Sequence, residues 1–204
     1  MGWWGERVLP RAIDRMLDND EVNAYRRTVC AGLSGTVLEI GFGSGLNVAF
    51  YPTAVERVLA VEPSDLAWEL SASRRAAYDA PVERTGLDGQ RLELGDGTVD
   101  HVLSTFTLCT IPEVGVALAE VRRVLRPGGE LHFLEHGQAP EASVVRWQRR
   151  INVVQRRVAG GCHLDRPIDA LVTGAGLDLV ALQSEYAAGL RPFAYVYCGT
   201  AANR

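Results

Sequence analysis

The stretch VLEIGFGSG, residues 37–45, decides the fold of this chain. A short apolar run that contains Glu39 leads directly into Gly41, Gly43 and Gly45, which stand at alternate positions. Glycine lets the backbone adopt positive φ and come close to a ligand. The stretch therefore predicts a buried strand that ends in a tight turn beside a ligand, and a tight turn without any ligand is the simpler alternative.

From residue 36 onward, short apolar runs alternate with longer amphipathic segments. The pattern predicts strands at 36–41, 57–63, 99–106 and 129–136, and helices near 45–54, 64–79, 113–125 and 141–158. Strands joined by helical crossovers form a doubly wound, Rossmann-like α/β parallel sheet. Two further strand patterns, 177–186 and 191–200, are separated by a short connection, so we expect a C-terminal hairpin and one antiparallel strand at or near the sheet edge.

The remaining composition is that of an ordinary globular protein. The chain has 204 residues, 47% of them apolar and 23% charged, and a net charge of −4, which gives no reason to expect nucleic acid. No apolar run is long enough to cross a bilayer and no secretory signal is present, so the expected location is cytoplasmic. The four cysteines form no CxxC pair and show no zinc-ligand spacing with the histidines, which predicts reduced, mostly buried thiols.

Three features near the glycine turn bear on its ligand. The dinucleotide fingerprint is G-x-G-x-x-G, whereas position 46 here is Leu and the third glycine comes one residue early. Glu39 would repel a pyrophosphate but would attract the ammonium of an amino-acid moiety, directly or through water. Glu62 closes the second predicted strand, where an acid accepts hydrogen bonds from ribose hydroxyls. Glu62 fits either nucleoside cofactor, whereas the compact glycine spacing and Glu39 favour S-adenosylmethionine over a nicotinamide cofactor.

The order of the motifs resembles class I S-adenosylmethionine-dependent methyltransferases, in particular the methyltransferase type 11 and ubiquinone-biosynthesis-like group. VLEIGFGSG, AVEPS, LDGQRLELGDGTVDHVLS and EVRRVLRPGGELHFLEH carry this resemblance. It implies a seven-stranded sheet whose last-inserted strand is antiparallel. It also implies cofactor contacts by Glu39, Gly41, Phe42, Gly43 and Gly45 at the methionine portion, by Glu62, Pro63, Asp88 and Gly89 at the ribose and adenine, and by Thr105 where cofactor and acceptor meet.

A narrower resemblance concerns the acceptor. STFTLCTIPE, FLEHG, RWQ and GGCHLDR are similar to small methyltransferases related to the methyltransferase-like alkyl thiol methyltransferases. We therefore expect a small, hydrophobic acceptor: a thiol, a phenol or quinone-type compound, or a lipid. Methyl transfer requires no metal, but a base would help a thiol or phenol to react. His136, at the end of a predicted strand, and His163, in a polar loop, are the candidate bases, and each is equally compatible with a structural role.

The expected organisation is a helical lid segment at 1–35 and a methyltransferase domain at 36–204. Trp3 and Trp4 would either cover the cofactor or anchor at an interface. The helix near 144–158 carries an apolar stripe and several arginines, which fits packing on the sheet or, alternatively, contact with an acceptor or an anionic membrane. Two other functions stay open: a non-catalytic module that binds S-adenosylmethionine, and a nicotinamide-dependent oxidoreductase. The sequence does not indicate an oligomeric state.

Overall fold

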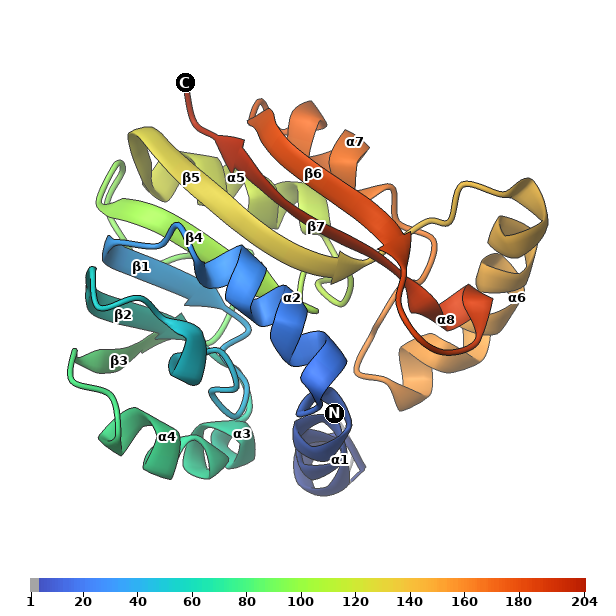
Figure 1. The fold of residues 1–204 in the computed structure, drawn as a ribbon, viewed down its shortest axis with the longest axis horizontal. Helices are drawn as coiled ribbons and strands as arrows, with labels where there is room; N and C mark the ends of the chain where they lie inside the picture. Colours follow the sequence, from blue (N-terminus) through green and yellow to red (C-terminus); the bar gives the residue numbers. More distant parts are fainter. Residues whose placement is uncertain (1–3) are drawn as a thin grey trace.

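A computed structural model describes residues 4–204 as a seven-stranded sheet with helices on both faces (Figure 1). The strands are β1 Gly35–Ile40, β2 Val55–Val61, β3 Val82–Gly86, β4 Val99–Thr105, β5 Leu125–His136, β6 Asp178–Tyr186 and β7 Tyr195–Ala202. The α-helices are α1 Leu9–Leu17, α2 Asp20–Cys30, α3 Asp65–Leu70, α4 Ala72–Ala76, α5 Val114–Val124, α6 Ala142–Val158, α7 Ile168–Gly174 and α8 Arg191–Ala194. A π-helical turn, Trp4–Val8, precedes α1.

The strand order is β3-β2-β1-β4-β5-β7-β6. Strands β1 to β5 pair in parallel, whereas β7 runs antiparallel to both of its neighbours, β5 and β6. The doubly wound sheet with one antiparallel strand next to its edge is thus confirmed. The strand order reverses between β1 and β4, and in open α/β sheets ligands bind outside the carboxyl ends of the strands at such a switch point.

The two faces of the sheet form two hydrophobic cores because successive strand residues point to opposite sides. On one face, α5 packs against β5 and α7 against β6 and β7, in a cluster that also contains Leu38 and Ile40 of β1. On the other face, α2 packs against β5 and β7, in a cluster that also contains Val37 of β1 and Leu103 of β4. Figure 1 shows α2 crossing in front of the sheet, with α5 and α7 behind it. Glu39 faces the same side as Val37, and its side chain is therefore buried under α2.

The structure departs from the predicted helices at one point near the glycine turn. The helix expected at 45–54 is only a short 3₁₀ turn, Val48–Phe50. Pro52 disfavours a helical conformation at Tyr51, which adopts an extended backbone (φ −66°, ψ 130°). The chain after the turn is consequently held by side-chain hydrogen bonds rather than by a helix.

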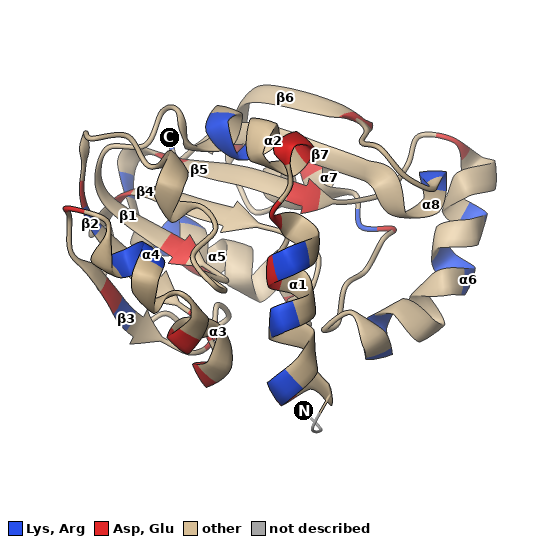
Figure 2. Ribbon diagram, turned by 60° about the horizontal axis from the view of Figure 1, so that its bottom comes forward, with Lys and Arg blue, Asp and Glu red and all other residues tan. Residues whose placement is uncertain are grey.

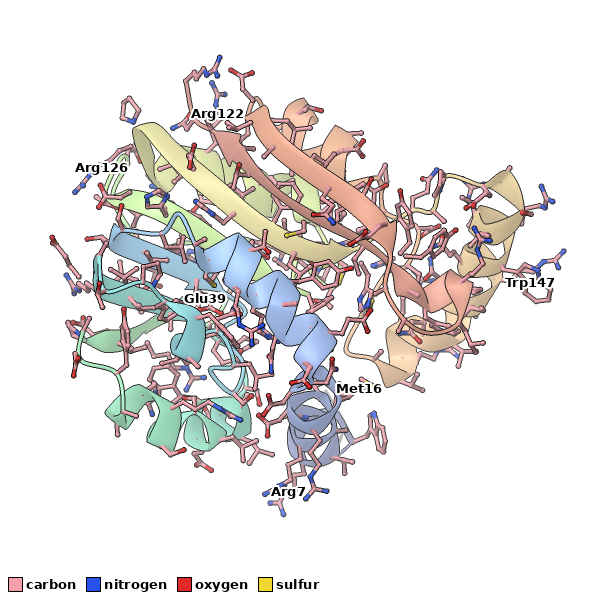
Figure 3. All side chains as sticks on the ribbon, viewed as in Figure 1. Arg7, Met16, Glu39, Arg122, Arg126 and Trp147 are labelled. Atoms are coloured by element: carbon pink, nitrogen blue, oxygen red, sulfur yellow. The ribbon has the colours of Figure 1, made fainter. Side chains whose placement is uncertain are left out.

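Helix α6 forms where it was expected, but it buries a different face. Trp147, Val154 and Val158 from the apolar stripe are exposed, and Trp147 projects from the outer side of the helix (Figure 3). The buried residues are Val145, Gln148 and Asn152. The prediction that the stripe packs on the sheet is therefore only partly correct: Val144 and Ile151 are partly buried against hydrophobic clusters, while the amide side chains of Gln148 and Asn152 are buried by binding neighbouring loops.

Two smaller differences concern strands. The sequence pattern did not reveal β3, which is an edge strand with no fully buried residue, and only the family resemblance implied a seventh strand. The C-terminal hairpin forms as predicted, but residues Arg191–Ala194 turn into the short helix α8 before β7 begins. Among the described residues, no helix combines the length and the apolarity needed to cross a membrane.

Candidate functional site

A cavity of about 590 Å³ opens beside the glycine turn, at the carboxyl ends of the parallel strands. Four of the sequence-predicted cofactor residues line it: Gly41, Pro63, Asp88 and Gly89. The loop after β4 and the chain after α6 complete the wall, together with the N-terminal segment (Thr107, Thr110, Ile111, Pro112, Gly160, Gly161, Trp4, Gly5 and Leu9). A cavity of this size lies within the range of cofactor and small-ligand sites.

Gly41 is the point at which the turn comes closest to its surroundings. Its φ is +76°, a left-handed conformation that side chains disfavour. A Cβ atom at this position would overlap the side chain of Thr107 in the loop after β4. Thr107 fills the place that a side chain at Gly41 would need, so the glycine lets the turn and the loop after β4 pack closely together at the cavity.

Glu62 follows the last residue of β2 and is 6% exposed. One carboxylate oxygen accepts the backbone N–H of Gly43 at 2.7 Å, and the other accepts the N–H of Ser64 at 2.7 Å. Burial raises the pKa of Glu62, and these two backbone hydrogen bonds oppose that shift. A carboxylate has about four acceptor sites, so two stay without a partner in the described chain, and Glu62 itself is absent from the cavity lining, whereas its neighbours Val61 and Pro63 belong to it.

Glu39 lies beneath the glycine turn, 1% exposed, and is absent from the cavity lining. Asn47 donates to its carboxylate at 2.6 Å, and the hydroxyl of Tyr51 donates to the other oxygen. Asn47 also donates to Thr105 Oγ1 at 2.9 Å and accepts from the buried Arg26. Burial raises the pKa of Glu39 to about 7, although its hydrogen bonds and Arg26 oppose the shift.

The other predicted cofactor residues also surround the turn. The side chain of Phe42 is buried and packs against Trp68 with 5.5 Å between ring centroids, so it points into the core. Gly43 and Gly45 have positive φ and contribute backbone only. Thr105 ends β4 and joins the Glu39 network through Asn47. The structure thus brings all the predicted residues to one end of the sheet, but only part of the set lines the cavity.

Sequence reasoning missed Arg26, Asn47 and Tyr51, which surround Glu39. A signal for two of them was present, since a buried carboxylate needs hydrogen-bond donors and the residues after the turn supply Asn47 and Tyr51 within a few positions. Arg26 carries no such signal, because α2 brings it from an earlier part of the chain.

The N-terminal segment lies over the cavity. The indole N–H of Trp4 donates to the carbonyl of Val158 at the end of α6, at 3.1 Å. Asp14 of α1 accepts from the hydroxyl of Ser44 at 2.6 Å and from Arg74 at 2.9 Å, which ties α1 to the glycine turn. Trp3, the other half of the predicted pair, lies outside the described residues.

Among the residues that the structure describes, neither candidate base lines the cavity. The His136 ring packs on Phe106, whose φ of +54° is left-handed, with 4.7 Å between centroids. The backbone N–H of His163 donates to the carbonyl of Cys109 at 2.8 Å, and partial burial lowers the pKa of its imidazole. Adjacent strand residues point to opposite faces, and the neighbouring Glu135 accepts from the hydroxyl of Ser104 on its own side of the sheet.

Cys109 and Cys162 meet near His136, with 3.8 Å between their sulfurs. Contact with Cys109 and the nearby His136 lower the pKa of Cys162 to about 5, whereas contact with Cys162 and burial raise that of Cys109. All four cysteines are free and buried, as the sequence predicted.

The strand order, the antiparallel β7 and the glycine turn define a Rossmann-like fold of the class I methyltransferase type. Residues 38–133 match the model of a methyltransferase domain family. The human thiol S-methyltransferase TMT1B is 37% identical over 143 residues, which cover 66% of this chain and 57% of that protein. A phosphatidylethanolamine N-methyltransferase of Cereibacter sphaeroides is 28% identical over 151 residues, covering 72% of this chain and 71% of that protein.

A solved structure, an S-adenosylmethionine-dependent methyltransferase of Thermotoga maritima, superimposes with a TM-score of 0.70 at 19% identity, covering 98% of both chains. The chain is thus similar to S-adenosylmethionine-dependent methyltransferases in sequence, over residues that include 38–133, and in fold. It spans little more than half the length of the thiol S-methyltransferases that it matches.

Proposed function

We propose that this chain transfers a methyl group from S-adenosylmethionine to a small, hydrophobic acceptor, with a thiol as the first candidate. The observation that carries the proposal is the position of Glu62, which closes β2 with free acceptor capacity beside the turn at Gly41. Gly41 lines the cavity with bare backbone, which lets a bound cofactor come close to the turn. A small-molecule acceptor also agrees with the size of the cavity.

The proposed cofactor residues bind different parts of S-adenosylmethionine. Glu62 accepts the ribose hydroxyls, Pro63 packs on the adenine, and Asp88 and Gly89 bind its polar edge. Gly41, Gly43 and Gly45 present backbone to the methionine portion, while Glu39 supplies negative charge beneath it. When bound, the cofactor supplies an electrophilic methyl group on a sulfonium. The protein contributes alignment of the two reactants and exclusion of water.

The lining of the cavity supports the proposed acceptor. Trp4, Leu9 and Ile111 give it apolar walls, which suit a hydrophobic molecule. Arg156 and Arg157 also belong to the lining, and basic residues lie along both α1 and α6 (Figure 2). Positive charge favours the anionic form of an acidic acceptor, so it supports a thiol or a phenol over an amine. The proposal assigns no general base, because neither His136 nor His163 lines the cavity.

The named relatives support different acceptors. Similarity to the thiol S-methyltransferases supports a thiol as the acceptor. Similarity to the phosphatidylethanolamine N-methyltransferase supports a lipid amine. Incubating the protein and S-adenosylmethionine with separate alkyl thiols, phenols and phospholipids, followed by mass spectrometry, tests the proposal. We expect equal amounts of S-adenosylhomocysteine and methylated thiol. Binding of the cofactor without turnover on any acceptor would instead identify a non-catalytic binding module.

A further inference from the structure

Three potential metal ligands meet behind the wall of the cavity. The sulfurs of Cys109 and Cys162 and a ring nitrogen of His136 all lie within 4.8 Å of one another. They come from three separate places: the turn after β4, the turn after α6, and the last residue of β5. Nothing in the comparisons with known proteins assigns a role to this cluster.

The spacing of the cluster matches a tetrahedral metal centre. Two sulfurs bound to one Zn²⁺ at about 2.3 Å in tetrahedral geometry lie about 3.8 Å apart. The observed distance between the Cys109 and Cys162 sulfurs is 3.8 Å. We propose that Cys109, Cys162 and His136 form a binding site for Zn²⁺, with water as the fourth ligand. Zn²⁺ prefers thiolate and imidazole ligands, whereas harder cations prefer oxygen ligands.

Buried polar side chains hold both cysteine segments in place. Glu135 is 0% exposed, and its carboxylate accepts the backbone N–H groups of Leu108 at 3.0 Å and Cys109 at 3.1 Å. Asn152, 6% exposed, accepts the N–H of Leu164 at 2.9 Å, just after Cys162. The two ligand turns are therefore fixed before any ion binds, which reduces the ordering that binding requires.

The charge of the set suits its burial. Cys109 is 1% exposed and Cys162 is 6% exposed. A lone buried charge is costly, but two thiolates and a neutral imidazole around Zn²⁺ sum to zero. A second cluster, His101, Glu130 and His132, has a similar spacing but offers no sulfur. The cysteine-containing cluster is the better match to zinc.

The position of the site gives the ion a structural role that is independent of the proposed methyl transfer. Both cysteines lie next to residues that line the cavity. These are Thr107 and Thr110 around Cys109, and Gly160 and Gly161 before Cys162. An ion bound by both cysteines joins these two parts of the cavity wall. Binding is therefore expected to raise the thermal stability of the protein.

The test uses the reduced, metal-free full chain titrated with Co²⁺ and then with Zn²⁺. We expect one Co²⁺ per chain with a thiolate-to-cobalt charge-transfer band, which the His101 cluster does not produce, and we expect Zn²⁺ to displace it. Cys109→Ser and Cys162→Ser should each weaken Zn²⁺ binding by at least about 100-fold, the upper end of the loss seen for outer-shell partners. Cys198→Ser, another buried cysteine, is the matched control.

Circular dichroism of the metal-free variants checks that they fold. His136→Gln retains both thiols and provides a second variant, for which weaker binding and a reduced rise in melting temperature with Zn²⁺ are expected. A titration without a thiolate band would overturn the proposal. An unchanged charge-transfer band in Cys109→Ser would also overturn it. So would an equal loss of Zn²⁺ affinity in Cys109→Ser and Cys198→Ser.

Discussion

The carboxylate of Glu62 accepts the backbone N–H of Gly43 at 2.7 Å. The acid at the end of β2 is therefore bound to the glycine turn at the end of β1, and its second oxygen holds Ser64 at 2.7 Å. This contact fixes the two neighbouring strand ends relative to each other. It also orients the carboxylate, whose two remaining acceptor sites are the ones that we propose for the ribose hydroxyls of the cofactor.

Replacing Glu62 with Ala tests this arrangement. Hydrogen bonds to charged groups contribute about 1.5–3 kcal/mol each, so losing them should weaken S-adenosylhomocysteine binding by at least about 10-fold. Isothermal titration calorimetry measures the effect. Glu83→Ala is the control, since Glu83 lies on the adjacent strand and pairs with Arg57 at the surface. Equal affinity in Glu62→Ala and the parent would remove Glu62 from the cofactor site.

Gly41→Ala should disturb both folding and binding. A Cβ atom there overlaps Thr107, and positive φ costs a non-glycine residue about 1–2 kcal/mol. We expect a lower melting temperature and weaker cofactor binding. Gly115→Ala is a control for which the opposite effect is expected. Gly115 lies in α5 with open space around it, and alanine stabilises a helix relative to glycine by about 0.5–1 kcal/mol. A Gly41→Ala protein as stable as the parent would contradict the close approach of the turn.

Glu39→Gln should change how stability depends on pH. Burial raises the pKa of Glu39 from 4.5 to about 7, so its stabilising contribution is complete below pH 4.5 and is lost as the pH rises through 7. The variant lacks this ionisation. Its free energy of unfolding relative to the parent should therefore increase with pH across this window, by about 3 kcal/mol in total. Urea unfolding at several pH values measures the difference, and a constant difference would argue against a buried, ionising Glu39.

The charges at Arg156 and Arg157 should affect the pH dependence of turnover. Replacing both with Gln removes positive charge from the cavity lining, so a thiol acceptor should need a higher pH to ionise. We expect slower methyl transfer near neutral pH and recovery at higher pH. Arg149→Gln with Arg150→Gln is the control pair on the same helix, outside the described lining. Identical pH profiles for both double variants would show that the lining charges do not act on the acceptor.

The topology was predictable because parallel strands buried on both faces leave continuous apolar runs, as in residues 58–61. Edge strand β3 lacks such burial, and the pattern missed it. The face of α6 was mispredicted because Gln148 and Asn152 are buried through hydrogen bonds with loop backbone, including Gly137 and Leu164. Local periodicity carries no information about such distant partners.

The candidate site, like the fold, was predictable only in part. Gly41 and Glu62 follow strands that the sequence pattern predicts, and parallel strands bring their carboxyl ends to one edge of the sheet. Asp88 follows the unpredicted strand β3, so only the family resemblance pointed to it. The meeting of Cys109 and Cys162 was not predictable, because 53 positions separate them and the contact depends on where α6 ends. Spacing rules for metal ligands apply to residues close in sequence, so they excluded a site that the fold assembles.

The central claim is that the cavity beside Gly41 binds S-adenosylmethionine through Glu62. Competitive calorimetry of the full chain with S-adenosylhomocysteine and NAD⁺ tests it most directly. We expect one equivalent of S-adenosylhomocysteine to bind, weaker binding in Glu62→Ala, and no competition by NAD⁺. Saturable NAD⁺ binding that displaces S-adenosylhomocysteine, or no binding of S-adenosylhomocysteine at all, would contradict it.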